Sequence, residues 1–198
     1  MNAKLLLTSL VWAASSTLLL AQKIQIIEGD LKLLKGQTVI NIETAFDNML
    51  VGAQIPEGTF VATKMEAWEA KEPGKGPAWK AMWFGEQEKN YKNIFGHYLF
   101  KESGLTVKEN VAPFTLILKT THMEPGWTIG VMGGVASISG EVWIVDSNDK
   151  SNVLVKISFT NIKGLDHSGG DFEMGRRIQG AYLNAGKQIG AFIKRRIN

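Results

Sequence analysis

"DFEMGRRIQGAYLNAGKQIGAFIKRRI", residues 171–197, carries a strong amphipathic pattern that sets the expected fold. Its apolar residues follow the four–three spacing of one helical face, at Ile178, Tyr182, Ala185, Ile189 and Phe192. Acidic residues begin the stretch and basic residues end it, which is the arrangement that the helix dipole favours. We therefore expect a C-terminal amphipathic helix that packs on a sheet.

The residues before this helix, "GGDF" at 169–172, come close to the Gly-Gly-Asp-Glu-Phe signature of cyclic-dinucleotide synthases. That signature belongs on a hairpin inside a nucleotide-binding domain, with upstream phosphate and metal ligands that this sequence lacks. Asp171 and Glu173 instead fit the first turn of a helix. We interpret "GGDF" as a loop that leads into the C-terminal helix.

Gly186 and Gly190 share the spacing seen in dimers of membrane helices. Lys187, Gln188 and Lys194 make this helix too polar for a bilayer. These two glycines, with Gly175 and Ala181, are therefore predicted to let the helix backbone approach the sheet closely.

Three strand-like runs precede the helix, at residues 114–121, 135–145 and 152–160. The last two are joined by "DSNDKSN", whose Asp and Asn residues favour a tight turn, so we expect an antiparallel hairpin. The glycine-rich "GVMGGVASISG", residues 130–140, lacks the Gly-Lys-Ser/Thr of a phosphate loop and predicts a strand bend or bulge.

Earlier in the chain, residues 37–51 alternate as a first strand, with a bulge expected near Ala45. Residues 59–71 predict one helix, and a second begins near Pro77 and ends at Ser103, with Gly104 as its C-terminal cap. The expected fold is a single α/β (α+β) domain over residues 37–198. Its sheet is mixed or mostly antiparallel, is backed by helices, and follows the order β-α-α-β-β-β-α.

The N-terminus predicts a secretory signal peptide over residues 1–21, with Lys4 before an apolar run that is too short and too polar for a membrane span. Residues 22–36 then form an arm or short strands. We expect a periplasmic or secreted protein without a membrane span after cleavage.

Composition narrows the class of partner. The formal net charge of +3 falls to +2 once Lys4 is removed, which is too small to indicate nucleic-acid binding. No cysteine is present, so the core must hold the fold without disulfides.

No catalytic, metal or cofactor motif is recognisable, and the interpretation that the chain is not an enzyme is favoured. The histidines, His97, His122 and His167, lack metal-ligand spacing. We expect no cofactor.

Tryptophan is the remaining residue type that most suggests a binding surface. Trp68, Trp79 and Trp83 surround the "KEPGKG" loop, and Trp127 lies in "EPGW". These rings either line a surface for a ligand or partner or close the core where helices meet the sheet. The equivalent spacing of Trp79 and Trp83 on one helical face favours the core.

Five segments together resemble a family of uncharacterised secreted proteins of Bacteroidetes-type bacteria: "ETAFDNMLVG", "KEPGKGPAWKAMW", "FKESGL", "EPGWTIGVMGGVASISGEVWIVD" and "RRIQGAYLNAGKQIGAFI". "AYLNAGKQIGAFI" and the strands before it are similar, more distantly, to envelope proteins related to the N-terminal domain of TolB. The resemblance implies an α/β domain that works in the cell envelope, with no established activity. Many relatives are lipid-anchored, and the missing cysteine departs from that pattern.

The first functional hypothesis is a non-catalytic module that binds a partner protein or an envelope component. The alternative is a small-molecule carrier or enzyme that uses the tryptophan region as its pocket. The oligomeric state cannot be predicted from the sequence.

Overall fold

The computed structural model of the chain describes residues 23–108, 111–129, 132–165 and 170–197. The expected signal peptide and His167 lie outside these ranges. The seven expected elements are all present, in the expected order. A strand (Lys23–Glu28) and a 3-10 helix (Leu31–Leu34) precede them, in the region predicted as an arm or short strands, and further short strands lie between them.

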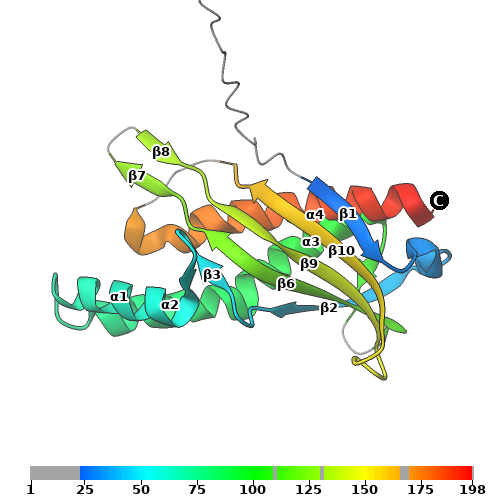
Figure 1. The fold of residues 1–198 in the computed structure, drawn as a ribbon, viewed down its shortest axis with the longest axis horizontal. Coiled ribbons are helices and arrows are strands. Elements are labelled where there is room, and N and C mark those ends of the chain that lie inside the picture. Colours follow the sequence, from blue (N-terminus) through cyan, green and yellow to red (C-terminus); the bar gives the residue numbers. More distant parts are fainter. Residues whose placement is uncertain (1–22, 109–110, 130–131, 166–169, 198) are drawn as a thin grey trace, which may run out of the picture.

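The main sheet has the strand order β1-β10-β9-β6-β2-β5 (Figure 1). Its strands are β1 (Lys23–Glu28), β2 (Val39–Ala45), β5 (Thr106–Val107), β6 (Phe114–Glu124), β9 (Ser137–Asp146) and β10 (Val153–Lys163). Neighbours from β1 to β6 pair antiparallel, whereas β2 runs parallel to both β6 and β5. The sheet is therefore mixed and mostly antiparallel, as predicted.

The predicted first strand is divided into two. β2 ends at Ala45, and β3 (Leu50–Val51) begins again after a turn in which Asn48 has a φ of 58°. β3 pairs with the later part of β6, at His122 and Met123, and with β4 (Ile55–Pro56). The chain therefore turns after Ala45 and then continues alongside the later part of β6. The expectation of a simple bulge near Ala45 was wrong.

The bulge predicted from glycine is present at Gly140 in β9. The pairing of β9 with β6 shifts between Thr120 and His122, and its pairing with β10 shifts between Phe159 and Ile162. A Cβ atom at Gly140 would lie 2.0 Å from the carbonyl oxygen of Lys119, so no larger residue fits this backbone.

β2 and β6 are parallel neighbours, and the chain connects them through the helices that lie between β4 and β5. These helices are α1 (Glu57–Glu69), α2 (Lys75–Gly85), a π-helical segment (Glu86–Asn90) and α3 (Tyr91–Ser103). The last three are continuous and correspond to the single helix predicted from Pro77 to Ser103. Gly104 ends it in the left-handed conformation, with a φ of 81°.

The C-terminal helix α4 (Met174–Ile197) packs on the sheet, as predicted, and lies beside α3 (Figure 1). All five residues of the predicted apolar face are buried. They join one continuous core with inward-facing residues of the sheet, such as Leu116, Leu118, Val142 and Ile157. None of the helices in the described ranges is long and apolar enough to cross a membrane.

Gly186 and Gly190 do allow a close approach, but to α3 and not to the sheet. A Cβ at Gly186 would lie 2.5 Å from the carbonyl oxygen of Phe95, and one at Gly190 would lie 2.9 Å from that of Leu99. The prediction that these glycines face the sheet was wrong, because the apolar stripe already occupies that side of α4. The glycines lie on the neighbouring side, where the two helix backbones meet.

Candidate functional site

Two of the four candidate tryptophans lie in the interior. Trp79 is 0% and Trp83 3% exposed, and their rings stack with centroids 5.5 Å apart. Phe60 of α1 contacts both rings, and the Trp83 indole N–H donates to Glu57 Oε1 at 2.8 Å. These rings join α2 to α1.

Trp68, at the end of α1, is half-buried. Its ring meets that of Phe172 edge-on, with centroids 5.0 Å apart, and Lys71 Nζ lies 4.1 Å from the ring centroid. Phe172 belongs to the short 3-10 turn Asp171–Glu173 that precedes α4. Trp68 therefore connects α1 to the "GGDF" segment.

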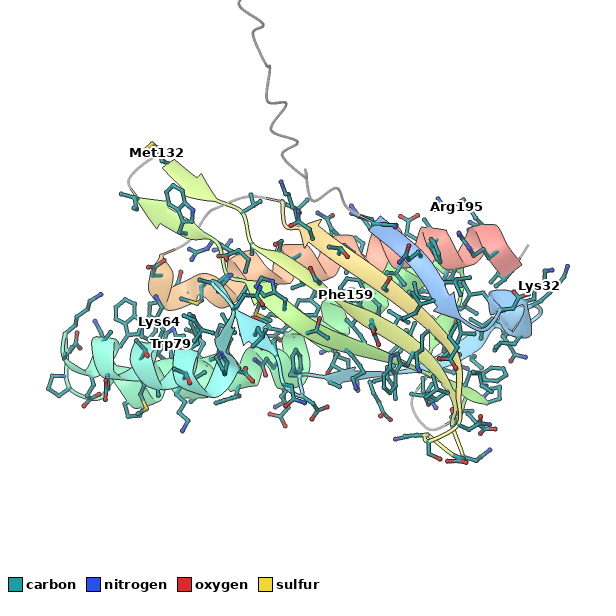
Figure 2. The ribbon with its side chains drawn as sticks, in the orientation of Figure 1. Lys32, Lys64, Trp79, Met132, Phe159 and Arg195 are labelled. Atoms are coloured by element: carbon teal, nitrogen blue, oxygen red, sulfur yellow. The ribbon has the colours of Figure 1, made fainter. Side chains whose placement is uncertain are left out.

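Trp127 is the most exposed of the four candidate tryptophans, with 46% of its surface exposed. It begins β7 (Trp127–Ile129), which pairs antiparallel with β8 (Met132–Gly134) in a small separate hairpin. Ile129 is 69% and Met132 63% exposed. Figure 2 shows Met132 on this hairpin, which projects from the end of the main sheet beside β3. The hairpin thus presents three large apolar side chains.

The Trp127 ring lies over Gly134, which has no side chain to obstruct it. Gly134 lies directly opposite Trp127, and a Cβ atom there would be 2.5 Å from the Trp127 indole nitrogen. The indole lies across this glycine, which leaves the remainder of the ring exposed. The glycine-rich sequence predicted only a bend or bulge here, and neither the hairpin nor a role for Ile129 or Met132 was predicted.

A buried arginine fixes the base of the hairpin. Arg177 of α4 is 2% exposed, and its Nε donates to the carbonyl oxygen of Pro125 at 3.1 Å. Its Nη2 donates to the carbonyl oxygen of Gly126 at 3.3 Å and to Asp171 Oδ1 at 3.2 Å, and its Nη1 donates to the carbonyl oxygen of Gly170 at 3.3 Å. A buried guanidinium needs such partners, because an unpaired charge in the interior is strongly unfavourable. Arg177 therefore joins the hairpin base, the "GGDF" segment and α4.

Within the "GGDF" segment, the described residues 170–172 make structural contacts. Gly170 supplies a carbonyl, Asp171 supplies the partner carboxylate of Arg177, and Phe172 packs on Trp68. Gly170 is the N-cap of the 3-10 turn, and Asp171 and Glu173 lie in its first turn, as predicted. The segment therefore lies where a loop leads into a helix, and the side chains of Asp171 and Phe172 also make tertiary contacts.

Trp143, not considered a candidate from the sequence, lies on the sheet face opposite the helices. Lys119 Nζ lies 4.0 Å and Lys156 Nζ 5.4 Å from its ring centroid, and its indole N–H donates to Glu141 Oε2 at 2.6 Å. Neighbouring side chains on the same sheet face therefore cover this ring.

The described residues offer no cluster of three or more His, Asp or Glu side chains that could hold a metal ion. Burial raises the pKa of Tyr91 and of Tyr182 above the usual value of a phenol, but both side chains lie inside the core. A substrate could not reach them. The exposed apolar side chains of Trp127, Ile129 and Met132 make the hairpin the candidate site.

Comparison with known proteins gives a distant structural likeness alone. No protein-family model matches the chain, and no curated protein sequence matches it significantly. The structure is similar to the PelC dodecamer from Paraburkholderia phytofirmans, with 11% identity, a TM-score of 0.42, and 86% of this chain and 99% of that chain covered. A variant of the same protein gives 11% identity and a TM-score of 0.35, with 85% of this chain and 98% of that chain covered. At this similarity, neither match carries an argument about activity or partners.

Proposed function

We propose that the chain is a non-catalytic binding module that works outside the cytoplasm and docks a partner protein through the β7–β8 hairpin. The predicted signal peptide supports the location. The observation that carries the docking role is the exposure of Trp127, Ile129 and Met132 together on one small, projecting hairpin.

Exposed apolar side chains of this size are costly in a soluble protein unless a partner covers them. Burial of one such side chain contributes about 1.5–3 kcal/mol, and tryptophan is among the residues that dominate binding energy at interfaces. The Arg177 contacts hold the hairpin base in place before binding. Little ordering cost would then oppose association.

A protein partner fits this surface better than an anionic membrane. Glu124 lies at the hairpin base, where its carboxylate accepts a hydrogen bond from the Gly126 N–H, and Asp171 there is paired with Arg177. The Glu124 charge would be repelled by anionic lipid headgroups. The alternative of a tryptophan-lined pocket has less support, because Trp79 and Trp83 fill the core.

Photo-crosslinking in the producing cell tests this function. A photoreactive amino acid would replace Ile129 and, as a matched exposed aliphatic control, Val111, which is 72% exposed on another loop. We expect one discrete protein adduct at position 129 that is absent at position 111 and is lost when Trp127→Ser is added. The same adducts at both positions, or lipid adducts at position 129, would contradict the proposal.

The partner identified in this way would then be purified for binding measurements. Trp127→Ser should raise its Kd at least tenfold without changing the melting temperature, since the ring is half-exposed and leaves no core cavity.

A further inference from the structure

Met132, the first residue of β8, is the most exposed methionine among the described residues, at 63% (Figure 2). The other described methionines are buried, at no more than 2% exposure, or half-buried: Met49, Met123 and Met174 in the core, and Met65 and Met82 on α1 and α2. The oxidation of a sulfur-containing side chain depends on its exposure to solvent. An oxidant in solution would therefore reach Met132 first.

The chain contains no thiol that would compete for an oxidant. Cysteine, whose thiolate oxidants attack readily, is absent. Methionine is then the one sulfur-containing residue type, and its oxidation converts a flexible apolar side chain into a polar sulfoxide. A protein outside the cytoplasm also lacks the thiol systems that keep cytosolic proteins reduced. Exposure and composition together single out Met132.

Met132 lies on the same face of the hairpin as the other two exposed apolar residues. It pairs directly with Ile129, and Trp127 lies two residues before Ile129 in β7. Directly opposite residues share a face of a sheet, and side chains alternate between faces along a strand. Thr128 points the other way, where Arg177 Nη1 donates to its Oγ1 at 3.5 Å. Met132 is therefore part of the docking face, directly beside Ile129.

A sulfoxide at Met132 would weaken docking without disturbing the core. Its oxygen is polar, so its burial against an apolar partner surface would be unfavourable. Methionine oxidation disrupts apolar interfaces for this reason. Because Met132 lies mostly in solvent in the free protein, its oxidation removes no core contact. The expected consequence is loss of binding by a protein that stays folded.

We propose that Met132 is an oxidation-sensitive site, whose conversion to methionine sulfoxide by hydrogen peroxide releases the partner from the hairpin. The thioether sulfur attacks one peroxide oxygen, the O–O bond breaks and a sulfur–oxygen bond forms. The departing hydroxide takes the proton of the transferred hydroxyl group and leaves as water. The sulfur loses two electrons, the peroxide gains them, and methionine sulfoxide reductases reverse the change. The proposal rests on the docking function of the hairpin and adds its regulation.

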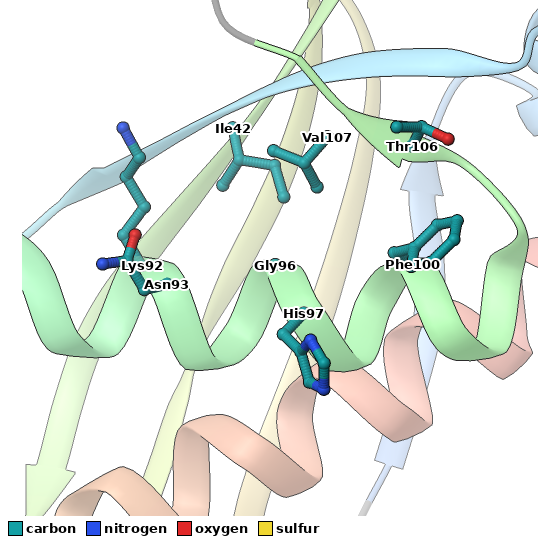
Figure 3. A pocket seen from close by; sticks show the side chains of 8 residues that line it. All are labelled: Ile42, Lys92, Asn93, Gly96, His97, Phe100, Thr106 and Val107. Atoms are coloured by element: carbon teal, nitrogen blue, oxygen red, sulfur yellow. The ribbon is translucent and has the colours of Figure 1, made fainter.

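A separate hollow, between α3 and the strands β2 and β5, would not respond to this oxidation. It has a volume of about 390 Å³, and its lining includes Lys92, Asn93 and His97 but no methionine (Figure 3). A ligand held in this hollow would meet the same side chains before and after methionine oxidation. Loss of binding on oxidation would therefore indicate the hairpin and not this hollow.

Peptide mass mapping of the mature protein during treatment with hydrogen peroxide tests the selectivity. We expect Met132 to gain one oxygen atom at least about tenfold faster than the buried Met49, and faster than the half-buried Met65 and Met82. The melting temperature should not change when Met132 alone is oxidised. Equal rates of oxidation at Met132 and Met65 would overturn the proposal.

Photo-crosslinking with purified protein tests the effect on binding. Wild type, Met132→Leu and Met65→Leu would each carry the photoreactive residue at position 129, be oxidised, be freed from peroxide, and be irradiated in an extract of the producing cell. Each adduct is compared with that of the same variant before oxidation. Leucine is an apolar residue of similar volume without sulfur. We expect oxidation to reduce the adduct at least about tenfold in wild type and Met65→Leu, and to leave that of Met132→Leu unchanged.

Treatment of the oxidised wild type with methionine sulfoxide reductases should restore the adduct, which separates methionine oxidation from damage to Trp127. An adduct that persists after complete oxidation of Met132 would overturn the proposal and leave the docking function intact. Equal losses in wild type and Met132→Leu would do the same. If the untreated wild type formed no adduct, the docking function would be wrong and this proposal would fall with it.

Discussion

The rings of Tyr91 and Tyr182 lie face to face, with centroids 4.4 Å apart and an interplanar angle of 6°. Tyr91 begins α3 and Tyr182 lies within α4, so this stack joins the two helices. The Tyr182 hydroxyl also hydrogen-bonds Thr120 Oγ1 of β6 at 2.6 Å. The pair therefore connects the helical layer to the central strand of the sheet.

Stability should fall at high pH because of this pair. Burial raises the pKa of both phenols, and the neighbouring Tyr182 raises that of Tyr91 further. The unfolded chain loses these protons near pH 10, whereas the native protein retains them, so the native state binds more protons above that pH. The free energy of unfolding should decrease by up to about 1.4 kcal/mol per pH unit for each tyrosine. Urea unfolding at pH 8 to 11 measures this slope.

Two phenylalanine variants give the control. In the described structure the buried Tyr91 hydroxyl has no hydrogen-bond partner, so Tyr91→Phe should leave stability at pH 7 unchanged or raise it. Tyr182→Phe should lose about 1–2 kcal/mol, because Thr120 Oγ1 loses its partner. Both variants should reduce the slope above pH 10. An unchanged slope in both would show that other groups cause the loss.

A second prediction concerns the contact between α3 and α4. Gly186→Ala should destabilise the protein by about 1–2 kcal/mol, because the new methyl group would meet the Phe95 carbonyl. Gly85→Ala is the matched control, since no atom lies within 4 Å of its new Cβ. There the higher helix propensity of alanine should increase stability by up to about 1 kcal/mol. Thermal unfolding of both variants tests the pair, and a stabilising Gly186→Ala would contradict the close approach.

The long elements could be predicted from the sequence because their signals are local. The apolar spacing from Ile178 to Phe192 fixes the face of α4, and Gly104 fixes the end of α3. The sequence could also place Trp79 and Trp83 on one helical face, but it could not show which surface that face contacts.

The hairpin was missed for a physical reason. Its strands are three residues long, too short for an alternating pattern, and its second strand contains Gly133 and Gly134, which also suit a bend. Gly126, with a φ of 70°, was the one local signal of a turn before Trp127. Arg177 could not be recognised because its partners at Pro125 and Gly126 are distant in sequence.

The third prediction concerns the anchoring of the hairpin by Arg177. Arg177→Met should destabilise the protein by about 3 kcal/mol, because the carbonyls of Pro125, Gly126 and Gly170 lose their donors in the interior. Asp171→Asn should cost only about 1 kcal/mol, since the Asp171 side chain is 49% exposed and water can replace the lost charge interaction.

The readout that separates anchoring from general stability is hydrogen exchange of a peptide covering residues 124–134. In Arg177→Met, amides of this peptide should exchange faster than those of β9 and β10 under conditions in which the protein stays folded. Arg177→Lys keeps the charge but lacks the planar fork that reaches several carbonyls at once, so it should show an intermediate rate. If the hairpin and the sheet exchange in parallel in all three variants, Arg177 stabilises the whole fold and does not fix the hairpin in particular.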